Sequence, residues 1–297
     1  MQILLAGATG AVGSSLSRAL ALQEVRVIPL TSRLGSGTPR GVLDLPAALE
    51  ALGSGGIDAV VNAAGPGDHR AEQREVEPFS RDLTHGSSRA GVPAVLISTL
   101  RVCEGATAAL GDDQPTSPTT TYATANADHE EVWMEGDTAV VLRLANYFCL
   151  PRGPESPQRK LLPWSLLVEG WETGHIAVRS EASVTREFVS ADDAARAIVA
   201  VIGERPFGRR LATLPGLSLS LRDLVDASIG ALASSGVPCT ASFGQETQPL
   251  RPVSTGGWLA SRGWESRLSL AEMQRSMRSW LIEWGQHLPT KCRPKES

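Results

Sequence analysis

A glycine-rich turn near the N-terminus is the part of the sequence whose residue types and spacing point most directly to chemistry. Residues 7–13 read GATGAVG, so that a glycine recurs at every third position. Gly7 allows a tight turn, Gly10 lets backbone amides approach a pyrophosphate, and Gly13 permits a helix to pack closely on a strand. The turn follows the apolar run Gln2–Ala6 and precedes a helical pattern, which is the context of a dinucleotide site. We therefore expect a dinucleotide cofactor at this turn.

The preference between NAD and NADP depends on the residues near the end of the second strand. A carboxylate there bonds the ribose hydroxyls of NAD. Residues 30–33 read LTSR and contain no acid. Arg33, helped by Ser32 or Arg40, can instead pair with the 2′-phosphate of NADP, although a solvated loop arginine is the alternative interpretation. The sequence thus favours NADP(H), with NAD(H) still possible.

Short apolar runs alternate with helical patterns along the first half of the chain. Strands are expected at residues 2–6, 25–30, 58–63, 94–98 and 140–144, and helices at 14–22, 46–52, 79–90 and 122–134. Continuous apolar strands separated by helices indicate a parallel sheet that is covered on both faces. The predicted class is α/β, with a Rossmann-type doubly wound parallel sheet and a smaller C-terminal α/β substrate region.

The composition changes after Leu150, where residues 151–163 are rich in proline and charge. We predict a NADP-binding Rossmann domain at 1–150, a mainly substrate-binding region at 151–290, and a flexible tail at 291–297. Some segments of the second region, such as 184–202, are expected to return to the Rossmann sheet. An apolar stripe at three- and four-residue steps over 270–288 indicates an amphipathic helix that packs in a core.

The overall composition excludes several classes of protein. The 297 residues carry a net charge of −4, so no basic surface for nucleic acid is expected. Four scattered cysteines without ligand-spaced histidines predict reduced thiols and no metal site. No apolar run approaches the roughly 18 residues of a membrane span, and no signal peptide is recognisable. We therefore expect a cytoplasmic protein that does not contact a membrane.

Five further motifs follow the glycine turn in order. They are NAAG at 62–65, LISTLRVCEG at 96–105, PTTTYATANADHE at 118–130, LRLAN at 142–146 and TREFVSADD at 185–193. Together with the turn, these motifs resemble the extended short-chain dehydrogenase/reductase family (NAD-dependent epimerases and dehydratases). Within that family they are similar to the nucleotide-sugar enzymes, such as dTDP-4-dehydrorhamnose reductase and the deoxysugar 4-ketoreductases.

The resemblance implies roles for individual residues. Thr99 carries the catalytic hydroxyl, and Tyr122 is the acid/base. Residues 62–65 resemble the family's segment after the fourth strand, which closes over the adenosine side of the cofactor. Asn146 contacts the substrate diphosphate, and Arg186 holds a nucleotide phosphate. A homodimer that forms through the tyrosine helix is a further expectation from the family.

The departure that matters most is at position 126. A ketone reduction needs hydride at the carbon and a proton at the oxygen, and a tyrosine hydroxyl gives that proton, although its ordinary pKa near 10 slows the reverse abstraction. In the family, a lysine four residues after the tyrosine lowers this pKa and holds the cofactor ribose. Here Asn126 gives YxxxN, which keeps a hydrogen-bond donor but no charge. Arg101 or, more weakly, Lys160 is a candidate source of the missing charge.

The expected function is NADP-dependent reduction of a keto group on a nucleotide-activated deoxysugar or a related small molecule. A first alternative is a nucleotide-sugar epimerase or dehydratase with retained cofactor. Such an enzyme must oxidise first, which is the direction that the missing lysine affects most. A second alternative is a non-catalytic dinucleotide-binding sensor or partner protein, because the lysine is lost.

These interpretations predict three sets of site residues. The catalytic residues are Thr99, Tyr122 and Asn126, and the substrate-binding residues are Thr99, Leu100, Arg101, Asn146 and Arg186. The cofactor-binding residues are Gly7, Thr9, Gly10, Ala11, Val12, Gly13, Arg33, Asp44, Leu45, Ala63, Ala64, Gly65, Ser98, Tyr122, Asn126 and Tyr147. No metal ligand is predicted.

Overall fold

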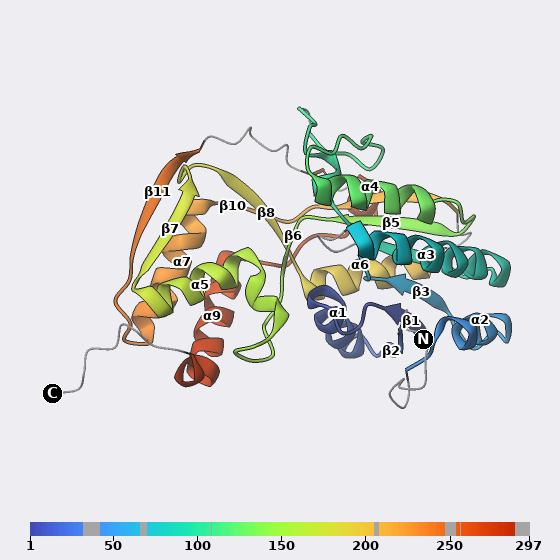
Figure 1. Ribbon diagram of the computed structural model, residues 1–297, viewed down its shortest axis with the longest axis horizontal. Coiled ribbons are helices and arrows are strands. Elements are labelled where there is room, and N and C mark those ends of the chain that lie inside the picture. Colours follow the sequence, from blue (N-terminus) through green and yellow to red (C-terminus); the bar gives the residue numbers. More distant parts are fainter. Residues whose placement is uncertain are drawn as a thin grey trace. The chain divides into compact units, whose positions relative to one another are not determined.

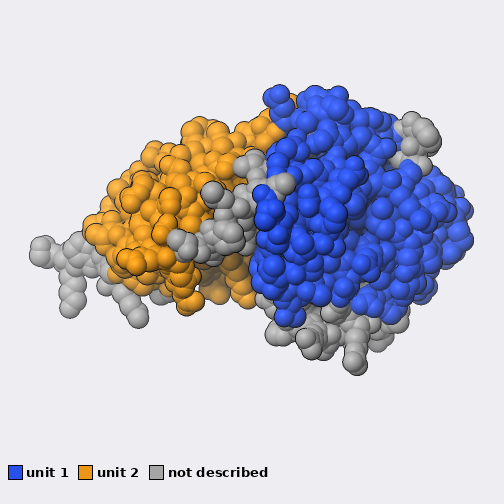
Figure 2. Space-filling view, turned by 90° about the horizontal axis from the view of Figure 1, so that it is seen from above, with its two compact units in different colours: residues 1–145, 191–215, 252–265 blue, residues 146–190, 216–251, 266–297 orange. Residues whose placement is uncertain are grey.

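A computed structural model describes residues 1–31, 42–65, 70–107, 109–204, 208–246, 254–255 and 257–288, with the side chains of 70–76 left out. The chain divides into two compact units, which Figure 2 shows in blue and orange. Unit 1 comprises residues 1–145, 191–215 and 252–265, and unit 2 comprises 146–190, 216–251 and 266–297.

Unit 1 is built on a six-stranded parallel sheet (Figure 1). Its strands are β1 (Gln2–Ala6), β2 (Arg26–Leu30), β3 (Ala59–Asn62), β4 (Ala94–Thr99), β5 (Ala139–Leu144) and β9 (Arg210–Leu214), in the order β2-β1-β3-β4-β5-β9. The strand order reverses between β1 and β3. In open α/β sheets, ligands bind beyond the carboxyl ends of the strands at such a reversal. The predicted Rossmann-type α/β class is confirmed.

Helices cover both faces of this sheet (Figure 1). Helices α1 (Ala11–Leu22) and α6 (Ala191–Gly203) pack together, whereas α3 (Arg70–Ala90) packs between α2 (Leu45–Gly53) and α4 (Thr121–Trp133). The central strands are buried on both sides, and every residue of β3 and β5 is buried. This burial explains the continuous apolar runs that predicted the sheet.

Two helices begin three or more residues earlier than the sequence pattern indicates. Helix α1 starts at Ala11 rather than Ser14, because it follows directly on the glycine turn. Helix α3 starts at Arg70 rather than Phe79, because its first turns are almost entirely polar and carry no apolar period. The segment 62–65 begins at the last residue of β3, which is the third strand of the described chain.

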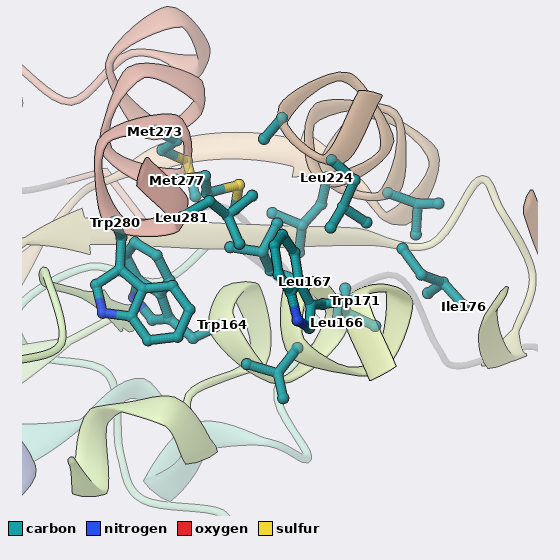
Figure 3. Packing of buried hydrophobic residues seen from close by; sticks show 14 of the residues in the cluster. Trp164, Leu166, Leu167, Trp171, Ile176, Leu224, Met273, Met277, Trp280 and Leu281 are labelled. Carbon is teal, nitrogen blue, oxygen red and sulfur yellow. The ribbon is translucent and has the colours of Figure 1, made fainter. Parts of the chain in front are cut away.

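The described residues of unit 2 form two small sheets and three α-helices around an aromatic core. One sheet has the order β10 (Leu217–Ser220), β8 (Thr185–Ser190), β6 (Asn146–Phe148), and the other pairs β11 (Thr240–Glu246) with β7 (His175–Ser180). The helices are α5 (Leu162–Thr173), α7 (Leu221–Ser234) and α9 (Leu270–Trp284). Figure 3 shows Trp164, Trp171 and Trp280 packed among leucines and methionines. The apolar stripe of α9 faces this core, with Met273, Met277 and Trp280 fully buried.

The chain passes between the units at different points from those that we predicted. Unit 1 runs to Ala145 rather than to 150, and β8 pairs with β6 and β10 in unit 2. Two segments return to unit 1: Ala191–Pro215, which supplies α6 and β9, in place of the predicted 184–202, and Pro252–Glu265. Among the described residues, no helix combines the length and the apolar composition that crossing a bilayer requires.

Candidate active site

The glycine turn is packed too tightly for side chains. Gly7 has a positive φ of 74°, and a Cβ atom on it would lie 2.6 Å from the backbone of Ala63 and Ala64. A Cβ on Gly13 would lie 2.1 Å from the carbonyl oxygen of Gly7. Helix α1 follows at once, and its N-cap residue, Gly10, has no capping side chain. A helix N-terminus of this kind, reached through a glycine cradle, fits the pyrophosphate of a dinucleotide.

The segment after β3, which we predicted to bind the cofactor, is held by a buried hydrogen-bond network. Asn62 accepts the amide of Ala64 through Oδ1 at 3.0 Å and donates through Nδ2 to Ser80 Oγ at 3.2 Å. The Ser80 hydroxyl lies 2.7 Å from Nε2 of His129 and can donate to it. Burial lowers the pKa of His129 to about 4, so this histidine is neutral at pH 7 and serves the network as a neutral partner.

Thr99 and Tyr122 reach the same region from a strand and a helix. Thr99 is the last residue of β4, and its Oγ1 accepts the amide of Arg101 at 3.2 Å, which caps the short 3₁₀ helix η1 (Leu100–Cys103). Tyr122 lies in the first turn of α4 and is half-buried. The guanidinium carbon of Arg101 lies 5.0 Å from the centroid of the Tyr122 ring. Arg101 therefore connects the two hydroxyl residues.

Sequence reasoning missed Glu104, which holds Arg101 in place. Its carboxylate accepts Arg101 Nε at 2.5 Å, Thr119 Oγ1 at 2.7 Å and Thr120 Oγ1 at 3.1 Å. Burial raises the pKa of Glu104, but these hydrogen bonds and the arginine charge outweigh burial, so the net pKa lies below its usual value. The spacing of Arg101 and Glu104, three residues apart, was the available signal, because such residues share a face of a helical turn.

Asn126, at the position of the family lysine, is directed into the protein. Its Nδ2 donates to the carbonyl of Tyr122 at 2.8 Å, and the residue is only 5% exposed. Its Oδ1 lies 3.8 Å from where a Cβ on Gly65 would be. Asn126 thus packs α4 against the segment after β3 and supplies no charge to Tyr122.

A buried ion pair fastens α4 to the sheet beneath the site. Arg143 of β5 contacts Glu130 of α4 at 2.7 Å, and both side chains are at most 4% exposed. Ser98, which we predicted to bind the cofactor, donates its hydroxyl to Glu130 at 2.5 Å. Arg143 Nη1 also donates to the carbonyl of Gln114 at 2.5 Å and lies 3.5 Å from Cys103 Sγ. Burial lowers the pKa of Arg143, but Glu130 outweighs it and the net pKa is raised.

The remaining predicted residues of unit 1 have different surroundings. Asp44 caps helix α2 by accepting the amide of Ala47 at 3.0 Å, and Leu45 is the first residue of that helix. Arg33, with Ser32 and Arg40, lies outside the described residues.

The predicted substrate residues Asn146 and Arg186 lie on neighbouring strands of unit 2. Asn146 pairs with Phe188, and Arg186 stands two residues before Phe188, so the register places both on one face of the sheet. Asn146 Nδ2 donates to the carbonyl of Glu187 at 2.8 Å, and Arg186 Nη1 donates to the carbonyl of Thr185 at 2.9 Å. Tyr147 is buried in β6.

Other side chains of the described chain offer little chemistry. The described cysteines, Cys103, Cys149 and Cys239, form no disulfide, and burial raises the pKa of the Cys103 thiol. Lys160, the weaker candidate for the missing charge, is exposed in unit 2. Within the described ranges, no three His, Cys, Asp or Glu residues are grouped so as to hold a metal ion.

Comparisons with solved structures show the same fold across nearly the whole chain. The dTDP-glucose 4,6-dehydratase of Bacillus anthracis, in complex with NAD, has a TM-score of 0.75 at 14% identity, with 96% of this chain and 99% of that chain covered. The UDP-glucuronic acid 4-epimerase of Bacillus cereus, in complex with UDP-glucuronic acid and NAD, has a TM-score of 0.72 at 18% identity, with 95% of this chain and 99% of that chain covered. DesIV, a dTDP-glucose 4,6-dehydratase of Streptomyces venezuelae with NAD and TYD bound, has a TM-score of 0.71 at 21% identity, with 96% of this chain and 99% of that chain covered.

Searching curated protein sequences gives no significant match. A family profile, in contrast, matches residues 3–210, which is more than half of the sequence. The matched region contains the glycine turn, Thr99, Tyr122 and the ion pair beneath them. The chain belongs to the NAD dependent epimerase/dehydratase family.

Proposed function

We propose that the protein is an NAD(P)-dependent oxidoreductase that reduces a keto group of a nucleotide-activated deoxysugar. The observation that carries this proposal is the meeting of Thr99, Arg101 and Tyr122 at the carboxyl end of β4. The glycine turn follows β1, which is separated from β4 by β3 in this parallel sheet, so it supports a dinucleotide site at the same edge.

The two hydroxyl groups have complementary roles in this proposal. Thr99 and Tyr122 donate hydrogen bonds to the ketone oxygen, and Tyr122 transfers its proton to that oxygen as negative charge develops there. The bound dinucleotide supplies hydride to the carbonyl carbon. Asn126 holds the tyrosine helix against the segment after β3 and would orient the ribose of a bound cofactor.

The charges around Tyr122 favour the role of proton donor. Arg101 is a cation beside the ring, but its ion pair with Glu104 offsets much of its charge. A phenolate is therefore less favoured here than beside an unpaired lysine, whereas a neutral tyrosine already holds the proton that reduction needs. The preference for reduction over oxidation concerns kcat, the turnover of the enzyme saturated with substrate. The ratio of kcat/KM for reduction to kcat/KM for oxidation is fixed by the equilibrium constant of the reaction, so no residue of the enzyme can change it.

The family also contains enzymes that oxidise first, so an epimerase with retained cofactor is the second candidate. Its support is the family itself. A dehydratase has less support, because eliminating a hydroxyl needs an acid beside the substrate. The residues after Thr99 are Leu100 and Arg101, and the first carboxylate, Glu104, is held by Arg101 and two threonines.

The proposed cofactor is NADP(H), with NAD(H) as the alternative. The support for NADP is the absence of an acid in residues 30–33 and the presence of Arg33. For the nucleotide sugar, Asn146 and Arg186 supply an amide and a guanidinium on one face of the β8–β6 pair, which suit phosphate oxygens.

The experiment that tests the proposal supplies the protein with NADPH or NADH and a panel of dTDP- and UDP-linked 4-keto-6-deoxysugars. A reductase consumes one reduced cofactor per product and transfers deuterium from C4-deuterated cofactor to the product. Conversion without net consumption of cofactor contradicts the proposal and favours the epimerase. A parent protein that binds cofactor but converts nothing, with activity gained in Asn126→Lys, favours a non-catalytic role.

A further inference from the structure

Arg101 is fixed against Tyr122 by several contacts, so its position does not rest on one flexible side chain. Its guanidinium carbon is 5.0 Å from the ring centroid, inside the range in which a cation interacts with an aromatic face. Nε donates to Glu104, and Nη2 reaches Thr120 Oγ1 at 3.4 Å. The backbone amide of Arg101 is bonded to Thr99. The arginine is thus held at both its backbone and its side-chain end.

Glu104 joins this arginine to the start of the tyrosine helix. Its side chain is 5% exposed, and it accepts hydrogen bonds from Thr119 and Thr120. Thr120 is the N-cap of α4 and accepts the amide of Ala123. The hydrogen bonds therefore run from Arg101 through Glu104 to the helix turn that carries Tyr122.

Other charged groups near α4 form ion pairs away from Tyr122 or lie further along the helix. Helix α4 packs against α3, β4, β5 and η1. On β5, Arg143 pairs with Glu130, eight residues beyond Tyr122. On α3, Arg81 and His85 contact Glu135 beyond the far end of the helix, and Asp82 lies close to Arg81. Asp128 and Glu131 of α4 itself lie more than one turn past Tyr122. Among the described residues of these elements, Arg101 is the cation that lies against the tyrosine ring, and Glu104 is its counter-charge.

We propose that Arg101, oriented by Glu104, is the positioning residue that supplies positive charge to Tyr122 in place of the lysine that unit 1 lacks. This inference rests on the proposed function, in which Tyr122 exchanges a proton with the substrate. Unit 1 contains no lysine anywhere in its sequence. The charge reaches Tyr122 from η1, across the helix N-terminus, instead of from the next turn of α4.

Ionisation of Tyr122 can be measured directly, because the chain contains only two tyrosines. The phenolate absorbance of the full-length protein is titrated against pH, and the same titration of Tyr122→Phe is subtracted. The difference reports Tyr122 alone, since Tyr147 contributes equally to both. Circular dichroism at each pH verifies that the protein remains folded over the range used.

Three variants decide whether Arg101 acts through its charge. Arg101→Gln should move the midpoint of the Tyr122 titration upward by about 0.5 to 1 pH unit, and Arg101→Lys should restore most of that shift. Glu104→Gln removes the opposing charge and keeps an acceptor for Arg101, so the midpoint should move downward. Shifts of opposite sign are the signature of an electrostatic effect, because loosening of the helix would move both variants in the same direction.

A matched control is Arg81→Gln, which breaks an ion pair at the far end of α4 whose arginine is about as exposed as Arg101, and it should leave the midpoint unchanged. An unchanged midpoint in Arg101→Gln, or equal shifts in Arg101→Gln and Glu104→Gln, overturns the inference. If Arg101→Gln does not fold, a downward shift in Glu104→Gln supports the inference, and any other result overturns it. The titration needs no substrate, so it gives its answer even if the conversion assay refutes the proposed function.

Discussion

The buried pair of Glu130 and Arg143 should be among the most important polar contacts of unit 1. In Arg143→Met, the carboxylate of Glu130 would stay buried without its counter-charge, while keeping the hydrogen bond from Ser98, and the Gln114 carbonyl would lose the Arg143 donor. Both side chains of the pair are at most 4% exposed, so water does not replace the lost contacts. Removing one member of such a pair costs about 3–5 kcal/mol of unfolding free energy.

The double variant Glu130→Met/Arg143→Met gives the size of the interaction. It removes the uncompensated charge and fills the space with apolar atoms, a replacement that is often neutral or stabilising for buried pairs. We expect the double variant to be more stable than Arg143→Met by about 1–3 kcal/mol, because it leaves no buried charge without a partner. The wild type, both single variants and the double variant form a complete cycle.

Unfolding in urea gives the free energies, and amide hydrogen exchange in β4 and β5 assigns the loss to unit 1. The control is Arg81→Met, which breaks a pair whose side chains are 41% exposed and should cost less than about 1 kcal/mol. The reasoning is refuted if Arg143→Met is no more destabilising than Arg81→Met, or if the double variant is as unstable as the sum of the single variants.

Three more predictions concern the pH response, the glycine turn and the cofactor. Burial lowers the pKa of His129 to about 4, so below about pH 6.5 the unfolded chain binds a proton at this histidine that the folded chain does not bind. The unfolding free energy should therefore fall by about 2 kcal/mol from pH 7 to pH 5. His129→Gln should flatten that slope in urea titrations, and an unaltered slope contradicts this origin. Gly13→Ala should abolish cofactor-dependent thermal stabilisation and cost at least about 2 kcal/mol, because its Cβ meets the Gly7 carbonyl, whereas Gly53→Ala, with open space around it, should be neutral or stabilising. Arg33→Ser should weaken NADPH binding about 10- to 100-fold in calorimetry and leave NADH binding unchanged, and equal losses for both cofactors would count against a 2′-phosphate contact.

The fold of unit 1 was predictable because its local signals agree with its tertiary structure. Strands β3, β4 and β5 are mostly apolar, as is typical of strands buried on both faces. The small strands of unit 2 were missed, because β6 and β10 have only three and four residues and too few positions to display a period. The start of α3 was also missed, because its first turns are polar and contain no apolar stripe.

The site was predictable only where a residue is recognisable by itself. Thr99 and Tyr122 were placed through the family resemblance, and Arg101 was one of two candidate cations. Glu104 was not found, because its threonine partners lie fifteen and sixteen residues away and meet it only after the chain folds back. Ser98 has a hydroxyl suited to a ligand, yet that hydroxyl is bonded to Glu130, which no spacing in the sequence indicates.

The most direct test of the central claim is turnover by Tyr122→Phe, measured beside its affinity for reduced cofactor. This change removes one hydroxyl and leaves the ring beside Arg101. We predict that the cofactor Kd stays within about twofold of the parent value, while the rate of keto-sugar reduction falls about 10²- to 10⁴-fold, as expected when a proton donor is lost. Reduction at the parent rate by Tyr122→Phe would contradict the assignment of Tyr122 as the proton donor.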